Sequence, residues 1–150
     1  MSSLFAFVHH FAAFALVSAL VVQFVLIKSE LTMYRARQLQ LADLALGASA
    51  STILLIGFLR VFYFEKGASY YFHSVPFIAK VTLFVIVFLL SIYPTVEFLS
   101  WRKHLRQGRA PVVPERKLRS LRAVIRWELI AAALIILCAA LMARGVEYFG

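Results

Sequence analysis

The chain has 150 residues, of which 63% are hydrophobic and 15% are charged, and its formal net charge is +9. Because soluble domains are only about half apolar, this composition excludes an ordinary soluble domain. It predicts a protein that is surrounded by lipid.

Four long apolar segments follow one another along the chain, at about residues 4–27, 41–64, 75–99 and 124–143. Each reaches the roughly 20 residues that a helix needs to cross a bilayer. Backbone groups in lipid must find their hydrogen bonds within the segment, so each segment is predicted to be a helix. The predicted fold class is therefore all-α, a polytopic bundle of four transmembrane helices that forms a single integral membrane domain over residues 1–150. No Lys or Arg precedes the first segment, which favours a permanent helix over a signal peptide.

Basic residues set the expected orientation of the bundle. Eight of the sixteen Lys and Arg residues lie within residues 101–123, and Lys28, Arg35 and Arg37 lie in the link after the first segment. By the positive-inside rule, both links face the cytoplasm and both termini face outward (N-out/C-out). The basic loop 101–123 is expected to attract anionic lipid headgroups. Nucleic acid is not an expected partner, because the loop adjoins the membrane and has no recognisable binding module.

Ionisable side chains lie just inside the ends of three segments. At 1.5 Å per residue, we expect His9 about 8 Å below the outer end of the first helix, Arg60 about 6 Å below that of the second, and Lys80 about 7 Å below that of the third. These antiparallel helices would bring the three groups to one layer. His10 follows His9, and neighbours on a helix point about 100° apart, so only one imidazole can face inward. The small residues around His9 favour that one.

Two explanations of Arg60 and Lys80 remain open. Long basic side chains can lie along lipid with their charges among the outer headgroups. Alternatively they bind an anion, because charge within a span is costly and positive charge on the outer side opposes the orientation bias. An imidazole with two nearby cations suits haem b, with the imidazole on the iron and the cations paired with the propionates. The candidate cofactor-binding residues are His9, His10, Arg60, Tyr63, Lys80 and His73. His9 is expected on the haem iron, and Tyr63 and His73 are expected to supply hydrogen bonds or a second ligand.

The order of these residues resembles that of HemJ-type bacterial membrane proteins. The resemblance rests on His9, Arg60, Tyr63 and Lys80, and it covers about residues 5–101. HemJ-type proteins oxidise protoporphyrinogen IX to protoporphyrin IX, and they group with CopD-like membrane proteins, several of which bind haem b. The chain is similar also to uncharacterised bacterial four-helix membrane proteins. The resemblance implies a haem b cofactor, membrane oxidoreductase activity and a place in the bacterial cytoplasmic (inner) membrane.

The expected function is therefore that of a haem-b-binding membrane redox protein. It would oxidise a porphyrinogen-like or other lipophilic donor, or pass electrons to quinone. Two alternatives stay open: a non-enzymatic structural or assembly subunit of a membrane complex, and a small-anion or proton-linked carrier that uses Arg60 and Lys80. The expected partners are the lipid bilayer and either further copies of the chain or a larger membrane complex.

Two further patterns give structural expectations. Gly47, Ala50 and Gly57 share one side of the second helix, which favours close approach of another helix over a flat cofactor. Acidic and basic residues also gather at the cytoplasmic ends of the helices, where such clusters usually form interfacial ion pairs. The residues expected in these pairs are Glu30, Asp43, Glu97 and Glu128 with Arg35, Arg37, Arg102 and Arg126.

Overall fold

The four apolar segments form four long helices in the computed structural model, which describes residues 2–64 and 75–144. The long helices are α1 (Ser2–Ile27), α2 (Met33–Leu59), α4 (Val75–Ser100) and α6 (Glu115–Ala143), with the short helix α5 (Arg102–Arg106) before the last of them. A π-helical turn, η1 (Arg60–Phe64), continues α2. All four long helices are long and apolar enough to cross a membrane. The predicted all-α fold with four membrane-spanning helices is confirmed.

Two helices extend beyond the apolar runs that predicted them. α2 begins at Met33 rather than near residue 41, and α6 begins at Glu115 rather than near residue 124. A helix satisfies its own backbone in water as well as in lipid, so apolar composition marks the part within the membrane and not the helix end. Thr32 caps α2, since its hydroxyl accepts a 3.2 Å hydrogen bond from the backbone N–H of Arg35. The predicted loop 101–123 is corrected accordingly, because it contains α5 and the first turns of α6.

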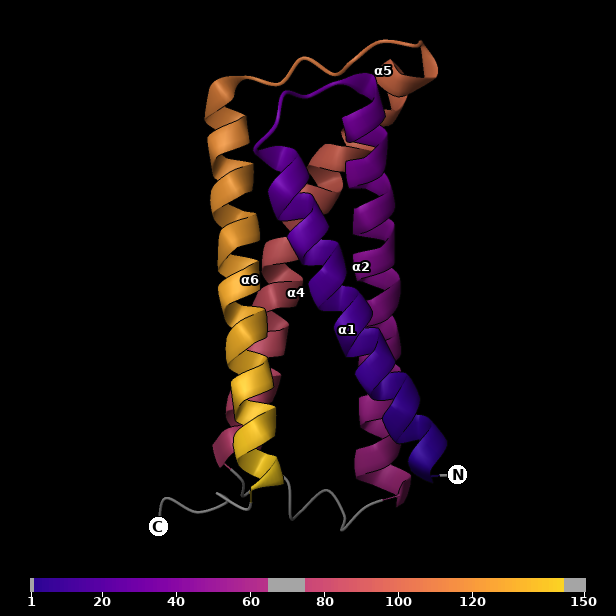
Figure 1. The fold of residues 1–150 in the computed structure, drawn as a ribbon, viewed down its shortest axis with the longest axis vertical. Helices are drawn as coiled ribbons and strands as arrows, with labels where there is room; N and C mark the ends of the chain where they lie inside the picture. The colour runs from indigo at the N-terminus through magenta and orange to yellow at the C-terminus, as the bar shows by residue number, and fades with distance from the viewer. Residues whose placement is uncertain (1, 65–74, 145–150) are drawn as a thin grey trace.

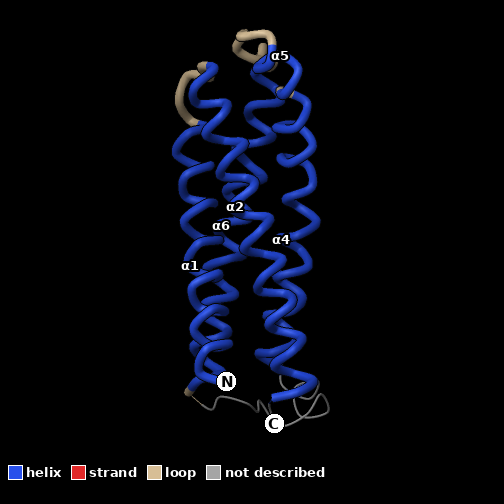
Figure 2. Tube along the Cα trace, turned by 90° about the vertical axis from the view of Figure 1, so that its right-hand side faces the viewer, coloured by secondary structure: helices blue, strands red, loops and turns tan. Residues whose placement is uncertain are grey.

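The long helices pack as two close pairs. α1 lies along α2, and α4 lies along α6; α1 also contacts α6, whereas α2 and α4 share few contacts. The pairs meet at the end of the bundle that carries the 28–32 link and α5, which we name the basic end, and they separate toward the opposite end (Figure 1). The N-terminus and the last turn of α6 both lie at that opposite end, as four crossings require (Figures 1 and 2).

Each long helix contributes to a hydrophobic core at the basic end. Ile27, Leu39, Phe98 and Ile125 come from the four long helices in chain order, and all are buried in one cluster. The Phe98 ring lies 5.0 Å, centroid to centroid, from that of Trp101. Lipid is as apolar as these side chains, so the cluster stabilises the bundle by close packing more than by removing apolar surface from water. It also fixes how the two helix pairs face each other.

Candidate functional site

Four polar side chains, each from a different long helix, lie together inside the bundle. They are Gln23 of α1, Asp43 of α2, Thr95 of α4 and Glu128 of α6, and we name this set the polar core. Gln23 and Glu128 both have 0% of their surface exposed. Helix α2 carries Asp43 about 15 Å from its start, and α6 carries Glu128 about 20 Å from its start. Polar residues within spans are costly and are typical of functional positions.

Local helix geometry explains why these side chains point inward. On a helix, residues spaced alternately by four and three positions share one face. In α1 and in α6, a polar residue occupies such a position within a stripe of buried apolar residues. The stripe in α1 is Leu16, Leu20, Gln23 and Ile27, and that in α6 is Leu121, Ile125, Glu128 and Ala132. The apolar neighbours therefore hold Gln23 and Glu128 in the interior of the bundle.

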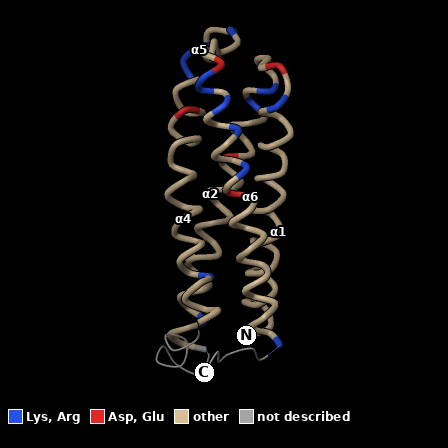
Figure 3. The backbone as a smooth tube through the Cα atoms, turned by 90° about the vertical axis from the view of Figure 1, so that its left-hand side faces the viewer, with Lys and Arg blue, Asp and Glu red and all other residues tan. Residues whose placement is uncertain are grey.

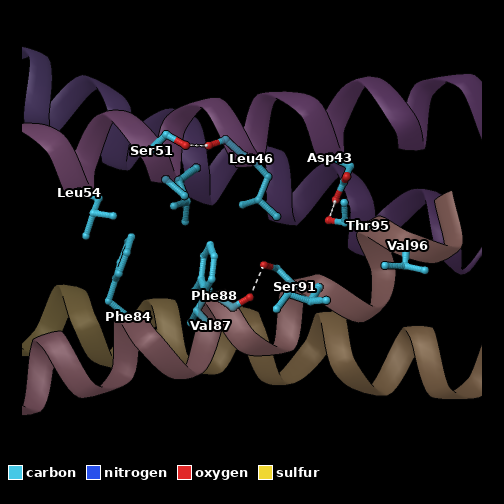
Figure 4. A pocket seen from close by; sticks show the side chains of 14 residues that line it. Asp43, Leu46, Ser51, Leu54, Phe84, Val87, Phe88, Ser91, Thr95 and Val96 are labelled. Carbon is cyan, nitrogen blue, oxygen red and sulfur yellow. Dashed lines mark hydrogen bonds between the residues drawn. The ribbon is translucent and has the colours of Figure 1, made fainter. Parts of the chain in front are cut away.

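Asp43 is the hydrogen-bonded member of the polar core. The hydroxyl of Thr95 donates to Oδ1 of Asp43 at 2.9 Å, and Nε2 of Gln23 donates to the same oxygen at 3.4 Å. These bonds link α2 to α4 and to α1, and Figure 4 shows Asp43 and Thr95 facing each other across the two helices. Both donors reach Oδ1, and none from the described residues reaches Oδ2.

Glu128 has different surroundings. Among the described residues, neither of its carboxyl oxygens has a hydrogen-bond partner, and Oε1 of Gln23 also has none. Asp43 lies close enough for its charge to act on Glu128. A buried ionised carboxylate without a donor is strongly unfavourable. The arrangement suits a carboxyl group that carries a proton, or one that loses its proton when a cation arrives.

The interfacial ion pairs predicted for Asp43 and Glu128 are wrong. In the part of the chain that the structure describes, the carboxylates in ion pairs are Glu97, 3.4 Å from Lys117, and Glu115, 3.4 Å from Arg122. Arg126, the predicted partner nearest in sequence to Glu128, is exposed. Arg126 and Glu128 are two positions apart, so the helix turns them to different faces. Figure 3 shows most Lys and Arg at the basic end, where some acidic residues also lie, and further acidic residues deeper in the bundle.

An apolar groove lies between α2 and α4, beside Asp43. Its volume is about 330 Å³. Leucine and phenylalanine side chains form its walls, while Asp43, Thr95 and Ser91 supply polar groups toward one end (Figure 4). Ser51 and Phe88 in its lining are exposed on the bundle surface, so the groove opens toward lipid. We name it the α2–α4 groove.

The close helix approach predicted at the small residues of α2 is wrong at its two glycines. A methyl group added at Gly47 or at Gly57 would meet no atom within 4 Å. Gly47 and Ala50 instead line the α2–α4 groove. The absent side chain thus leaves space for something other than a neighbouring helix.

The residues predicted for the outer layer lie at the opposite end of the bundle. His9 is half-buried, whereas His10 is exposed and its Nδ1–H donates to the carbonyl oxygen of Ala6 at 2.6 Å. Arg60 is half-buried at the start of η1, and Lys80 is half-buried in α4. His9, His10 and Arg60 belong to the α1–α2 pair, and Lys80 belongs to the α4–α6 pair. The two pairs separate toward this end of the bundle (Figure 1).

Tyr63 and His73 are the two remaining predicted site residues. Tyr63 lies in η1 and is 77% exposed. His73 lies outside the described residues. Within residues 2–64 and 75–144, no group of three or more His, Cys, Asp or Glu side chains is arranged to hold a metal ion.

A family of predicted membrane proteins, DUF2214, has a model that matches residues 1–147. The chain belongs to the DUF2214 family. No curated protein and no solved structure matches the chain. The match covers all four long helices, so the polar core and the α2–α4 groove both lie within the DUF2214 region.

Sequence patterns alone had not placed the polar core of this DUF2214 chain. The sequence patterns do not mark Gln23 and Thr95 as site residues, and they place Glu128 in interfacial ion pairs at the cytoplasmic ends of the helices. The useful signal was a polar residue at a position where the spacing of apolar residues requires an inward-facing one. Gln23 and Glu128 each interrupt such a stripe, and this distinguishes them from Arg126, which does not.

Proposed function

We propose that this protein is a proton-linked membrane carrier, in which Glu128 and Asp43 bind the coupling proton. The observation that carries the proposal is the complete burial of Glu128 without a hydrogen-bond partner among the described residues. Ionisable groups inside membrane bundles commonly belong to proton or ion pathways. The proposed coupling groups are thus carboxyls in the interior of the bundle, in place of the Arg60 and Lys80 of the sequence-based alternative.

The two carboxyls have different proposed roles because their surroundings differ. Asp43 accepts hydrogen bonds from Thr95 and Gln23, which suits a carboxylate. Glu128 has no donor and suits a carboxylic acid. Because the Asp43 charge acts on Glu128, a cation that binds beside Asp43 would change the cost of ionising Glu128. Such linkage between a proton and a bound solute is what a coupled carrier needs.

Infrared spectroscopy tests whether the Glu128 carboxyl gains and loses a proton as the pH changes. In purified full-length protein, the C=O stretch of a buried carboxylic acid should appear at acidic pH and disappear reversibly as pH rises. The Glu128→Gln variant should lack this band, because an amide holds no exchangeable carboxyl proton. Glu97→Gln is the matched control, since Glu97 pairs with the exposed Lys117.

The control should retain the band of the native protein. A carboxylic-acid band from Glu128 that does not change with pH would assign that proton a purely structural role and overturn the proposal. An identical spectrum in Glu128→Gln would do the same.

A second candidate function, haem b binding, draws support from the opposite end of the bundle. The half-buried His9 lies at the same end as the half-buried cations Arg60 and Lys80. Arg60 also begins the π-helical turn η1, and such turns within α-helices are frequent at functional sites. An imidazole and two cations are the residue types that would hold the iron and the propionates of haem b. When bound, haem would supply one-electron chemistry; the chain would hold its iron through His9 and its carboxylates through Arg60 and Lys80.

A reduced-minus-oxidised visible spectrum of protein from haem-replete cells tests this candidate. The native protein and His10→Ala should show the bands of haem b, and His9→Ala should lose most of them. His10 is the matched control because it follows His9 directly yet is exposed. A colourless native preparation, or equal bands in both variants, would remove His9 as the ligand.

The basic end supports a further part of the proposed membrane role, contact with anionic lipid. Side chains on α5 and on the first turns of α6 are exposed, namely Arg102, Lys103, Arg106, Arg116, Lys117 and Arg119. Exposed basic residues beside a bilayer attract negatively charged headgroups. This contact would hold the α4–α6 pair at a fixed depth while the polar core exchanges its proton.

A further inference from the structure

We infer that the α2–α4 groove binds a lipophilic monocation, of the class of aryl-substituted ammonium or phosphonium ions. This inference rests on the proposed carrier function and names its substrate class. Three properties of the groove carry it: its opening toward lipid, the chemistry of its lining, and the carboxylate within it.

The groove is open because α2 and α4 are not tightly packed against each other. α1 covers α2 and α6 covers α4, whereas α2 and α4 share few contacts. Apart from the backbone of its own helix and its chain neighbours, no atom lies within 4 Å of the position that a Cβ atom at Gly47 would take. The volume of about 330 Å³ lies at the lower end of the range for small-molecule sites, about 300–1,000 Å³.

The lining favours a ligand that has a positive charge as well as apolar surface. Asp43 is the residue of the lining that can carry a charge. Phe84 and Phe88 project from α4 into the space between the helices (Figure 4). Aromatic faces attract organic cations, and most strongly where water is excluded. A cation with apolar substituents therefore finds partners along the groove, while an anion of the same shape meets the Asp43 carboxylate.

Asp43 also links cation binding in the groove to the proton held by Asp43 and Glu128. Its Oδ1 accepts the bonds from Thr95 and Gln23, and its Oδ2 has no donor among the described residues. Glu128 of α6 is a titratable group that lies within reach of the Asp43 charge. A cation in the groove would favour the ionised carboxylates and so release a proton from the pair. Binding should weaken on acidification because protons and the cation compete for the same groups.

Calorimetric titration of the detergent-purified full chain tests the inference, with tetraphenylphosphonium as the probe. Tetraphenylborate has nearly the same shape and the opposite charge. The native protein should bind the phosphonium ion with saturation and should not bind the borate. Gly47→Leu fills part of the groove, and Asp43→Asn removes its charge. Each should weaken phosphonium binding at least about tenfold, the first by occupying the site of the ion and the second by removing a charged contact.

Gly57→Leu is the matched control. Gly57 lies on the same helix with equally open space but does not line the groove, so binding should stay at the native level. Absence of phosphonium binding, equal binding of the borate, or native binding by Gly47→Leu would each overturn the inference. Equal binding of both ions would show an apolar slot of the kind that a lipid acyl chain fills.

The infrared measurement separates this inference from the proposed function. If the Glu128 band titrates but the phosphonium ion does not bind, the proton role stands and the substrate class is wrong. If the ion binds as described but the Glu128 band does not titrate, the groove is a binding site and the coupling is wrong.

Discussion

Replacing Phe98 by Ala is expected to lower the free energy of unfolding by about 2–4 kcal/mol. Phe98 is 1% exposed and packs in the cluster where the two helix pairs meet. Its loss leaves a cavity, and neighbours such as Trp101, whose ring lies 5.0 Å away, lose their contacts. The effect is smaller than for a soluble core, because the unfolded helices keep the ring in an apolar medium.

Unfolding in mixed micelles of a mild detergent and SDS, followed by far-ultraviolet circular dichroism, measures this change. Leu99→Ala is the control: Leu99 is the next residue in α4 but is 46% exposed. Its change should remain below about 1 kcal/mol. Equal losses in the two variants would show that the cluster at the basic end does not hold the pairs together.

Replacing Asp43 by Ala is expected to lower the free energy of unfolding by about 1–3 kcal/mol. The Thr95 hydroxyl and the Gln23 amide both donate to Oδ1 of Asp43. Without that oxygen, both donors lose their acceptor. Because these bonds join α1, α2 and α4, the loss should also loosen the contact between the two helix pairs.

Asp43→Asn separates the hydrogen bonds from the charge. Asparagine keeps an oxygen at the Oδ1 position, so both donors retain their acceptor, and its stability should lie within about 1 kcal/mol of the native protein. The same unfolding measurement applies. A loss in Asp43→Asn as large as in Asp43→Ala would mean that the negative charge, and not the accepted hydrogen bonds, stabilises the bundle.

The fold was predictable because lipid imposes a length and a composition on each span. The apolar runs located all four long helices, and the end of α1 at Ile27 and the start of α4 at Val75 agree with them. The starts of α2 and α6 were not predicted. There the helix continues into polar sequence, where composition carries no information on helix length and local signals such as the Thr32 cap decide.

The polar core was harder to predict because its members belong to four different helices. Periodicity shows that Glu128 shares a face with Leu121 and Ile125, but it does not show which residues of the other helices lie opposite. Asp43 is near basic residues in sequence, and its actual partners, Gln23 and Thr95, are 20 and 52 positions away. The groove depends on the relative placement of α2 and α4, which no local pattern determines.

The pairing of consecutive helices implies an order of assembly. Since α1 packs on α2 and α4 packs on α6, each hairpin can close as soon as its second helix has entered the bilayer. A newly made half would still expose Asp43 or Glu128 to acyl chains until it meets its counterpart. Joining the halves brings the Thr95 hydroxyl of α4 to Asp43 of α2, and this hydrogen bond favours the meeting of the two hairpins.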